Sequence, residues 1–195
     1  MNIALSGAHG PKDPKGIKVF AQDDCGHKIV HVLSGQYAVS STEGTYFSTV
    51  LGSCVCACIY DPVAGIGGIN HFVLPVGGES APQEQRYRYG DVAMPGLLGN
   101  LCRRGAQRER LMVKLFGGRA RNDGSYEPGV LNADFALAFV NTNGLKLIES
   151  SLGGQVARWV NFHPASGRTK VRETLDSPAF PVSRRTVISL SRRSA

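Results

Sequence analysis

The chain has 195 residues, 42% of them hydrophobic, which is enough apolar material for one globular domain and too much for a disordered protein. No run approaches the ~20 apolar residues of a membrane span, and residues 1–16 lack the basic start and apolar core of a secretory signal. We therefore expect a cytoplasmic protein without membrane insertion. Disulfides rarely persist in that compartment, so the five cysteines, an odd number, should be free thiols.

The formal charge of +7 is concentrated in two basic segments, 103–110 (RRGAQRER) and 183–193. Such a charge attracts nucleic acid, an acidic protein or an anionic membrane, and by itself it selects none of them. We expect no nucleic-acid partner, because the chain has no recognition motif and no aromatic residues interleaved with the basic ones.

The first part of the chain is expected to hold a leader and then several strands. Residues 1–27 are rich in Gly, Pro, Lys and Asp, which favours a flexible segment. From residue 28 onward, short apolar runs alternate with turn residues, and this pattern is typical of strands. The expected strands are 27–33, 37–40, 46–51, 53–61 and 64–75.

Two helices are expected in the middle of the chain. The first should run from its N-cap, Asp91, to Gly105, and the second from Asn132 to Gly144. The remaining expected elements are a strand within 110–118 and a hairpin over 155–173 whose turn is PASG.

This order of strands, helix, strand, helix and strands predicts a mixed α/β or α+β domain, with helices packed on a substantial sheet system. The domain should cover residues 28–173, after the leader, and residues 174–195 should form a polar, basic tail.

Three of the five cysteines, Cys54, Cys56 and Cys58, alternate along one predicted strand and should share one of its faces. Their C-x-C-x-C spacing lacks the second ligand pair of a zinc site, so we expect no metal. Cys56 and Cys58 lie inside the apolar run and are expected to fill the core.

Cys54 is different because it follows the small residues Gly52 and Ser53 at the start of the strand. A turn that leads into a strand can expose a sulfur and offer backbone N–H groups to an oxyanion. A thiol nucleophile also needs a base, and His71 on the next predicted strand is the best-placed candidate. The alternative for His71 is a half-buried, hydrogen-bonded structural histidine.

Four segments covering most of residues 28–171 resemble the CheD family of chemoreceptor glutamine deamidases. They are TVLGSCVCACIYDPVAGIGGINHFVLP (49–75), RYGDVAMPGLLGNLCRRGAQRERLMVKLFGG (88–118), NADFALAFV (132–140) and LGGQVARWVNFHPASGRTKV (152–171). The resemblance implies a cytoplasmic hydrolase that converts glutamine side chains of methyl-accepting chemotaxis receptors to glutamate and releases ammonia. It implies no cofactor, and a mixed β-sandwich core flanked by helices, similar to the cysteine hydrolase fold of a toxin deamidase.

The resemblance also assigns residues. The family's nucleophile, which forms a thioester, falls on Cys54, and its histidine falls on His71. Its third catalytic residue is a threonine six positions before the cysteine, where this chain has Ser48, which keeps the hydroxyl. Thr49 is the adjacent alternative, expected on the opposite face of the strand. Weaker candidates for substrate or oxyanion contacts are Gly52, Ser53, Thr49 and Asn70.

The implied partners are the cytoplasmic helices of the receptors and a CheC-type phosphatase. The basic segment 103–110 is a candidate contact for an acidic receptor helix. Two other functions stay open at this point. The same residues could cleave methyl esters of receptor glutamates, or the protein could be a chemotaxis scaffold with weak or lost activity.

Overall fold

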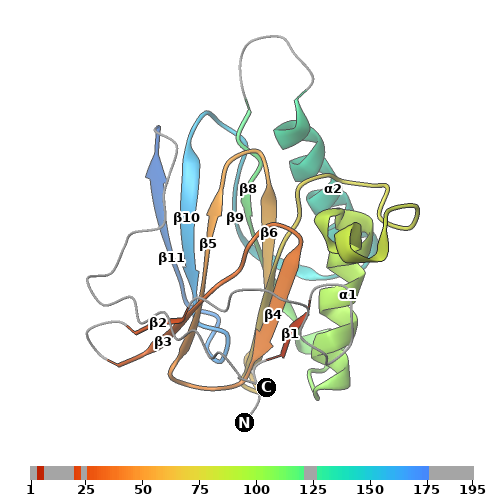
Figure 1. Ribbon diagram of the computed structural model, residues 1–195. Helices are drawn as coiled ribbons and strands as arrows, with labels where there is room; N and C mark the ends of the chain where they lie inside the picture. Colours follow the sequence, from red (N-terminus) through yellow and green to blue (C-terminus); the bar gives the residue numbers. More distant parts are fainter. Residues whose placement is uncertain (1–3, 7–19, 23–25, 121–126, 176–195) are drawn as a thin grey trace, which may run out of the picture.

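The computed structural model describes residues 4–6, 20–22, 26–120 and 127–175, and these form three layers (Figure 1). In chain order the elements are β1 (Ala4–Ser6), β2 (Phe20–Gln22), β3 (Lys28–His31), β4 (Gln36–Ser40), β5 (Thr45–Leu51), β6 (Val55–Asp61), β7 (Ile66–His71), η1 (Gln83–Arg88), α1 (Gly90–Arg103), η2 (Arg108–Arg110), β8 (Met112–Gly117), α2 (Pro128–Thr142), β9 (Lys146–Leu152), β10 (Ala157–Phe162) and β11 (Thr169–Thr174).

A six-stranded sheet, ordered β1-β4-β7-β6-β8-β9, forms the middle layer. A five-stranded sheet, ordered β11-β10-β5-β3-β2, packs on one of its faces, and α1 and α2 cover the other (Figure 1). Both sheets are mixed, because β8 pairs with β9 and β3 with β5 in parallel, beside antiparallel neighbours. The expected α+β class, with a β-sandwich core flanked by helices, is confirmed.

Strand β6 is buried along its whole length because it lies inside the middle sheet, with a layer on each face. Cys56 and Cys58 belong to the core between the two sheets, whereas Val55 and Ala57 belong to the core under the helices. Cys54 packs against the same core as the other two cysteines. The prediction that the three share one face, with Cys56 and Cys58 as core residues, is confirmed.

Residues 1–27 are not wholly a leader. Strand β1 pairs with β4 in the middle sheet, and β2 pairs with β3 in the five-stranded sheet. The expectation of a flexible segment is therefore wrong for these six residues, whose backbone groups extend one edge of each sheet. The other residues of 1–25, and the predicted tail from 176 onward, lie outside the described residues.

Strand β9 has no counterpart among the expected elements. It follows α2 and pairs in parallel with β8, so β8, α2 and β9 form a crossover unit. It lies at the edge of its sheet, and none of its residues is fully buried. A strand in that position has no need of the alternating apolar pattern by which strands are recognised in a sequence.

Both helices begin before the expected residue. The first starts at Gly90, and the carboxylate of Asp91 accepts hydrogen bonds from the Gly77 and Gly78 N–H groups instead of capping the helix. The second starts at Pro128, a favourable first residue because proline has no N–H to leave unpaired. Asn132 therefore lies inside α2 rather than at its start. No helix in the described ranges is long and apolar enough to cross a membrane.

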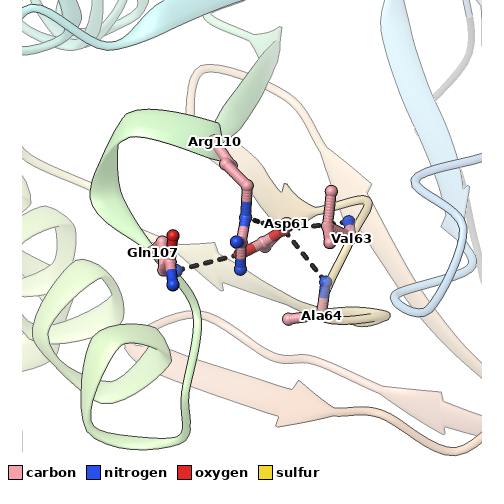
Figure 2. Close-up of polar contacts among 5 residues, drawn as sticks. All are labelled: Asp61, Val63, Ala64, Gln107 and Arg110. Carbon is pink, nitrogen blue, oxygen red and sulfur yellow. Dashed lines mark hydrogen bonds and ion pairs between the residues drawn. The ribbon is translucent and has the colours of Figure 1, made fainter.

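A buried carboxylate closes the end of β6. Figure 2 shows that Asp61 accepts hydrogen bonds from the backbone N–H groups of Val63, Ala64 and Gln107 and from the guanidinium of Arg110. Burial alone would raise the pKa of Asp61, but the Arg110 hydrogen bonds and the three backbone donors hold it well below its usual range. The charged form therefore ties the β6–β7 turn to the segment before β8.

Replacing Asp61 by asparagine is expected to lower the free energy of unfolding by roughly 2–4 kcal/mol, because an amide cannot accept all of these donors. The stability that Asp61 supplies is present above its unfolded pKa near 3.8 and is lost as the pH falls below that value. Urea unfolding at neutral pH measures the effect. The exposed neighbour Glu109, changed to glutamine, is the control, and equal losses in the two variants would contradict this account.

Candidate active site

The chain passes from β5 in the five-stranded sheet to β6 in the middle sheet through a short turn that contains Cys54. The last residue of β8 and the two residues that follow it hold this turn in place. The Gly118 N–H donates to the Cys54 carbonyl at 2.8 Å, and the Arg119 N–H donates to the Gly52 carbonyl at 2.9 Å. Gly117 has a φ of 114°, and a Cβ there would lie 2.1 Å from the Cys54 carbonyl oxygen. The absence of a side chain at Gly117, the last residue of β8, therefore lets the chain pass close behind Cys54.

His71 is the last residue of β7, which is the strand next to β6. The β6–β7 pairing continues past the strand ends, since Val55 and Phe72 exchange two backbone hydrogen bonds of 3.1 and 3.0 Å. This register places Cys56 opposite His71 and Cys54 diagonally across from it, on the same face. A diagonal neighbour on a paired strand is within reach of a long side chain such as histidine.

Thr49, on β5, faces His71 across the space between the sheets. Its hydroxyl lies 2.7 Å from the Val32 carbonyl, to which it must donate because that oxygen can only accept. The threonine oxygen, 2.8 Å from His71 Nδ1, then accepts the Nδ1 proton. This arrangement leaves the Nε2 lone pair of the neutral ring open, and Nε2 is buried with no hydrogen-bond partner among the described residues.

Ser48 does not contact His71, and its predicted hydrogen bond to the imidazole is wrong. Its hydroxyl instead accepts from the indole N–H of Trp159 at 2.6 Å. The reason is the change of sheet at the turn. Phe47, Thr49 and Leu51 point into the space between the sheets, so Ser48 points to the outer face of the five-stranded sheet. Counting alternate residues from Cys54 back to Ser48 therefore gives the wrong face for Ser48, because the chain changes sheet between them.

The remaining predicted residues fall into two groups. Gly52 and Ser53 lie in the turn beside Cys54, as expected. Asn70 lies on the other face of β7 from His71, where its amide oxygen accepts from the Ala57 N–H at 2.8 Å and its amide nitrogen contacts the Met94 sulfur. Asn70 is therefore placed to support the sheet under the helices, and this geometry does not support its predicted contact with substrate or oxyanion.

Burial keeps both members of the candidate pair uncharged. It raises the pKa of the Cys54 thiol, an effect that the cysteine's own backbone N–H and the charge of Arg88 oppose. Burial also lowers the pKa of His71 to about 4 from its ordinary 6.5, against the effect of the Val32 carbonyl. At neutral pH the resting pair is a thiol and a neutral imidazole, so the ring is ready to accept a proton.

The basic segment 103–110 lies far from this pair. Cys54 precedes the first residue of β6 and Asp61 is its last, which separates them by about 20 Å at the usual rise of a strand. Arg110 binds Asp61, at the far end of β6. A receptor contact in 103–110 would thus lie remote from the reacting group. The exposed Arg88, which sequence reasoning missed, is close enough to lower the pKa of Cys54.

The described ranges contain no group of three or more His, Cys, Asp or Glu side chains that could hold a metal ion. The cysteines in these ranges, Cys54, Cys56, Cys58 and Cys102, are free.

The buried imidazole makes stability depend on pH. The unfolded chain protonates His71 near pH 6.5 and the folded chain only near pH 4, so between these values only the unfolded state gains the proton. Stability is therefore fully present above about pH 6.5 and is lost as the pH falls, by about 2 kcal/mol at pH 5.

Changing His71 to glutamine should remove this part of the pH dependence. Urea unfolding of the parent and the variant, each at about pH 7.5 and about pH 5, measures it. We expect the loss of unfolding free energy between the two pH values to be about 2 kcal/mol larger in the parent. The same loss in both proteins would mean that His71 titrates normally.

Comparison with known proteins places the chain in a family. A family model described as CheD chemotactic sensory transduction matches residues 73–173. The probable chemoreceptor glutamine deamidase CheD of Caulobacter vibrioides is 45% identical over 154 residues, which are 78% of this chain and 82% of that protein. The protein of the same name from Cereibacter sphaeroides is 39% identical over 150 residues, 77% of this chain and 74% of that protein. The chain therefore belongs to the CheD family.

A crystal structure of the Bacillus licheniformis hypothetical protein YfiH aligns with 58% of this chain and 49% of its own, at 12% identity and a TM-score of 0.39, too low to relate the two folds. The region matched by the family model begins after His71. Cys54 and His71 therefore lie outside the region that the family model matches.

Proposed function

We propose that the protein is a chemoreceptor glutamine deamidase, with Cys54 as nucleophile and His71 as general base and acid. The observation that carries the proposal is the orientation of the buried ring. Thr49 and Val32 hold Nδ1, and the open Nε2 lies on the face that Cys54 shares. Family membership supplies the substrate, a glutamine side chain on a chemotaxis receptor.

The first half of the reaction forms a thioester. The Cys54 proton moves to His71 Nε2 as the sulfur bonds to the carboxamide carbon of the substrate. The Cys54 backbone N–H, which acts to lower the pKa of its own thiol, lies beside the reacting sulfur and can donate to the oxyanion on the substrate. The carbon–nitrogen bond then breaks, the leaving nitrogen takes the proton from Nε2, and ammonia departs.

Water completes the reaction. It gives a proton to Nε2 as its oxygen bonds to the thioester carbon, the carbon–sulfur bond breaks, and the sulfur recovers the proton from the ring. The products are glutamate and the free thiol. Thr49, and not Ser48, keeps the ring in the required tautomer through both halves.

Analysis of the products on a purified receptor cytoplasmic fragment tests the proposal. Release of ammonia, with the mass gain of an amide-to-acid conversion on a glutamine peptide, would support it. Methanol release from a methylated receptor would indicate an esterase instead. Binding of the fragment without either product would indicate a scaffold. A CheC-type phosphatase stays a predicted partner. Titration of a purified phosphatase of that type into this protein, with binding as the readout, tests the prediction.

A further inference from the structure

A buried asparagine on α2 connects the two segments that carry the candidate pair. Asn132 is fully buried, and its side-chain NH₂ group donates to the Ser53 carbonyl at 3.0 Å and to the Val73 carbonyl at 2.8 Å. Ser53 immediately precedes Cys54, and Val73 follows His71 by two residues. One planar amide thus sets the distance between the turn that holds the thiol and the segment that holds the imidazole.

The hydrogen bond from Asn132 to the Ser53 carbonyl is one of three that hold successive backbone carbonyls of the turn. The carbonyls of the successive residues Gly52, Ser53 and Cys54 accept from the Arg119 N–H, the Asn132 amide and the Gly118 N–H. These carbonyls are all held by the β8 end and α2. The Cys54 N–H, which acts to lower the pKa of its own thiol, lies beside the sulfur and can donate to the oxyanion that forms on the substrate. Without the Asn132 bond, the middle carbonyl of the turn would lose its donor.

The amide oxygen of Asn132 gives the second observation. It is buried and has no hydrogen-bond partner among the described residues. A buried, unpaired oxygen costs free energy, and a residue that only joined two loops could avoid that cost. Local costs of this kind are typical of functional sites.

We propose that Asn132 is a positioning residue that fixes Cys54 relative to His71 and so sets the rate of attack on the substrate. The inference rests on the proposed roles of Cys54 and His71. Asn132 acts through the backbone of the turn and needs no contact with the substrate. Its removal should therefore slow the chemical step and leave substrate binding nearly unchanged.

Asn132→Ala is expected to lower kcat on the receptor fragment by roughly 10-fold or more, with KM changed by less than about threefold. The matched control is Asn143→Ala. Asn143 lies at the other end of α2, and its amide also donates to a backbone carbonyl, that of Phe139, at 2.9 Å. Its kcat should stay within about twofold of the parent.

Two results would overturn the proposal. One is a kcat for Asn132→Ala equal to that of Asn143→Ala. The other is a rise in KM with kcat unchanged, which would mean that the residue contacts the substrate. If the alanine variant does not fold, as judged by circular dichroism, Asn132→Ser takes its place because its hydroxyl keeps one donor. A folded serine variant with the parental kcat would equally reject the proposal.

A parallel assay of Cys54→Ala separates this inference from the proposed function. Full activity in Cys54→Ala would reject the nucleophile itself. An inactive Cys54→Ala beside a fully active Asn132→Ala would reject the positioning role alone. Alkylation of Cys54 by iodoacetamide, followed by peptide mass mapping with the exposed Cys102 as internal reference, adds a readout without substrate. We expect faster alkylation of Cys54 in Asn132→Ala, because a looser turn exposes the sulfur.

Discussion

Replacing Cys54 by alanine is expected to reduce ammonia release from a receptor fragment by at least about 10³-fold, because the thioester can no longer form. The fold should survive, since Cys54 lies at the margin of the core between the sheets and is only partly buried. A stopped ammonia assay, with circular dichroism to verify folding, measures the loss.

The sharpest control for this prediction is Cys56→Ala. Cys56 lies directly opposite His71 in the strand register and shares its face, so it is the other thiol near the ring. It is fully buried inside β6, where a receptor side chain cannot reach it without opening the sheet. We expect its alanine variant to keep activity within about threefold of the parent, after a modest loss of stability. The opposite pattern would make Cys56 the nucleophile.

The placement of His71 near Cys54 could be predicted from the sequence because it depends on patterns among residues that are close together in the chain. The alternation of Cys54, Cys56 and Cys58 defines a strand face, and a short turn after Asp61 that ends in Gly65 returns the chain beside it. Together they place His71 near Cys54 without any long-range information. Most of the strands were predictable in the same way, since each carries a clear apolar pattern.

The errors come from tertiary contacts that no local pattern encodes. Thr49 takes the role predicted for Ser48 because the chain changes sheet between β5 and β6. As a result, Thr49 on β5 points into the space between the sheets, and Ser48 points to the outer face. Asn132 resembles a helix cap in the sequence, but its amide is used on two distant carbonyls. Strand β9 is defined by its pairing with β8 and not by its own apolar pattern.

Because Thr49 rather than Ser48 contacts His71, substitutions at these two adjacent residues should have different effects on kcat. Thr49→Val keeps the shape of the side chain and removes the oxygen that accepts the His71 Nδ1 proton. The ring then has only the more distant Val32 carbonyl, at 3.4 Å, to hold that proton. Loss of the fixed tautomer should lower kcat on the order of 10²-fold, less than for a charged third residue, because threonine contributes no charge.

Ser48→Ala is the matched control, since it also removes one buried hydroxyl from β5. It leaves the Trp159 indole N–H without its acceptor, so we expect a stability loss of about 1 kcal/mol and a kcat within about threefold of the parent. Thr49→Ser, which restores the oxygen, should recover most of the activity lost in Thr49→Val. Should Ser48→Ala prove the slower enzyme while Thr49→Val stays active, the ring would be held from the outer face. The orientation of His71 that supports the mechanism would then be wrong.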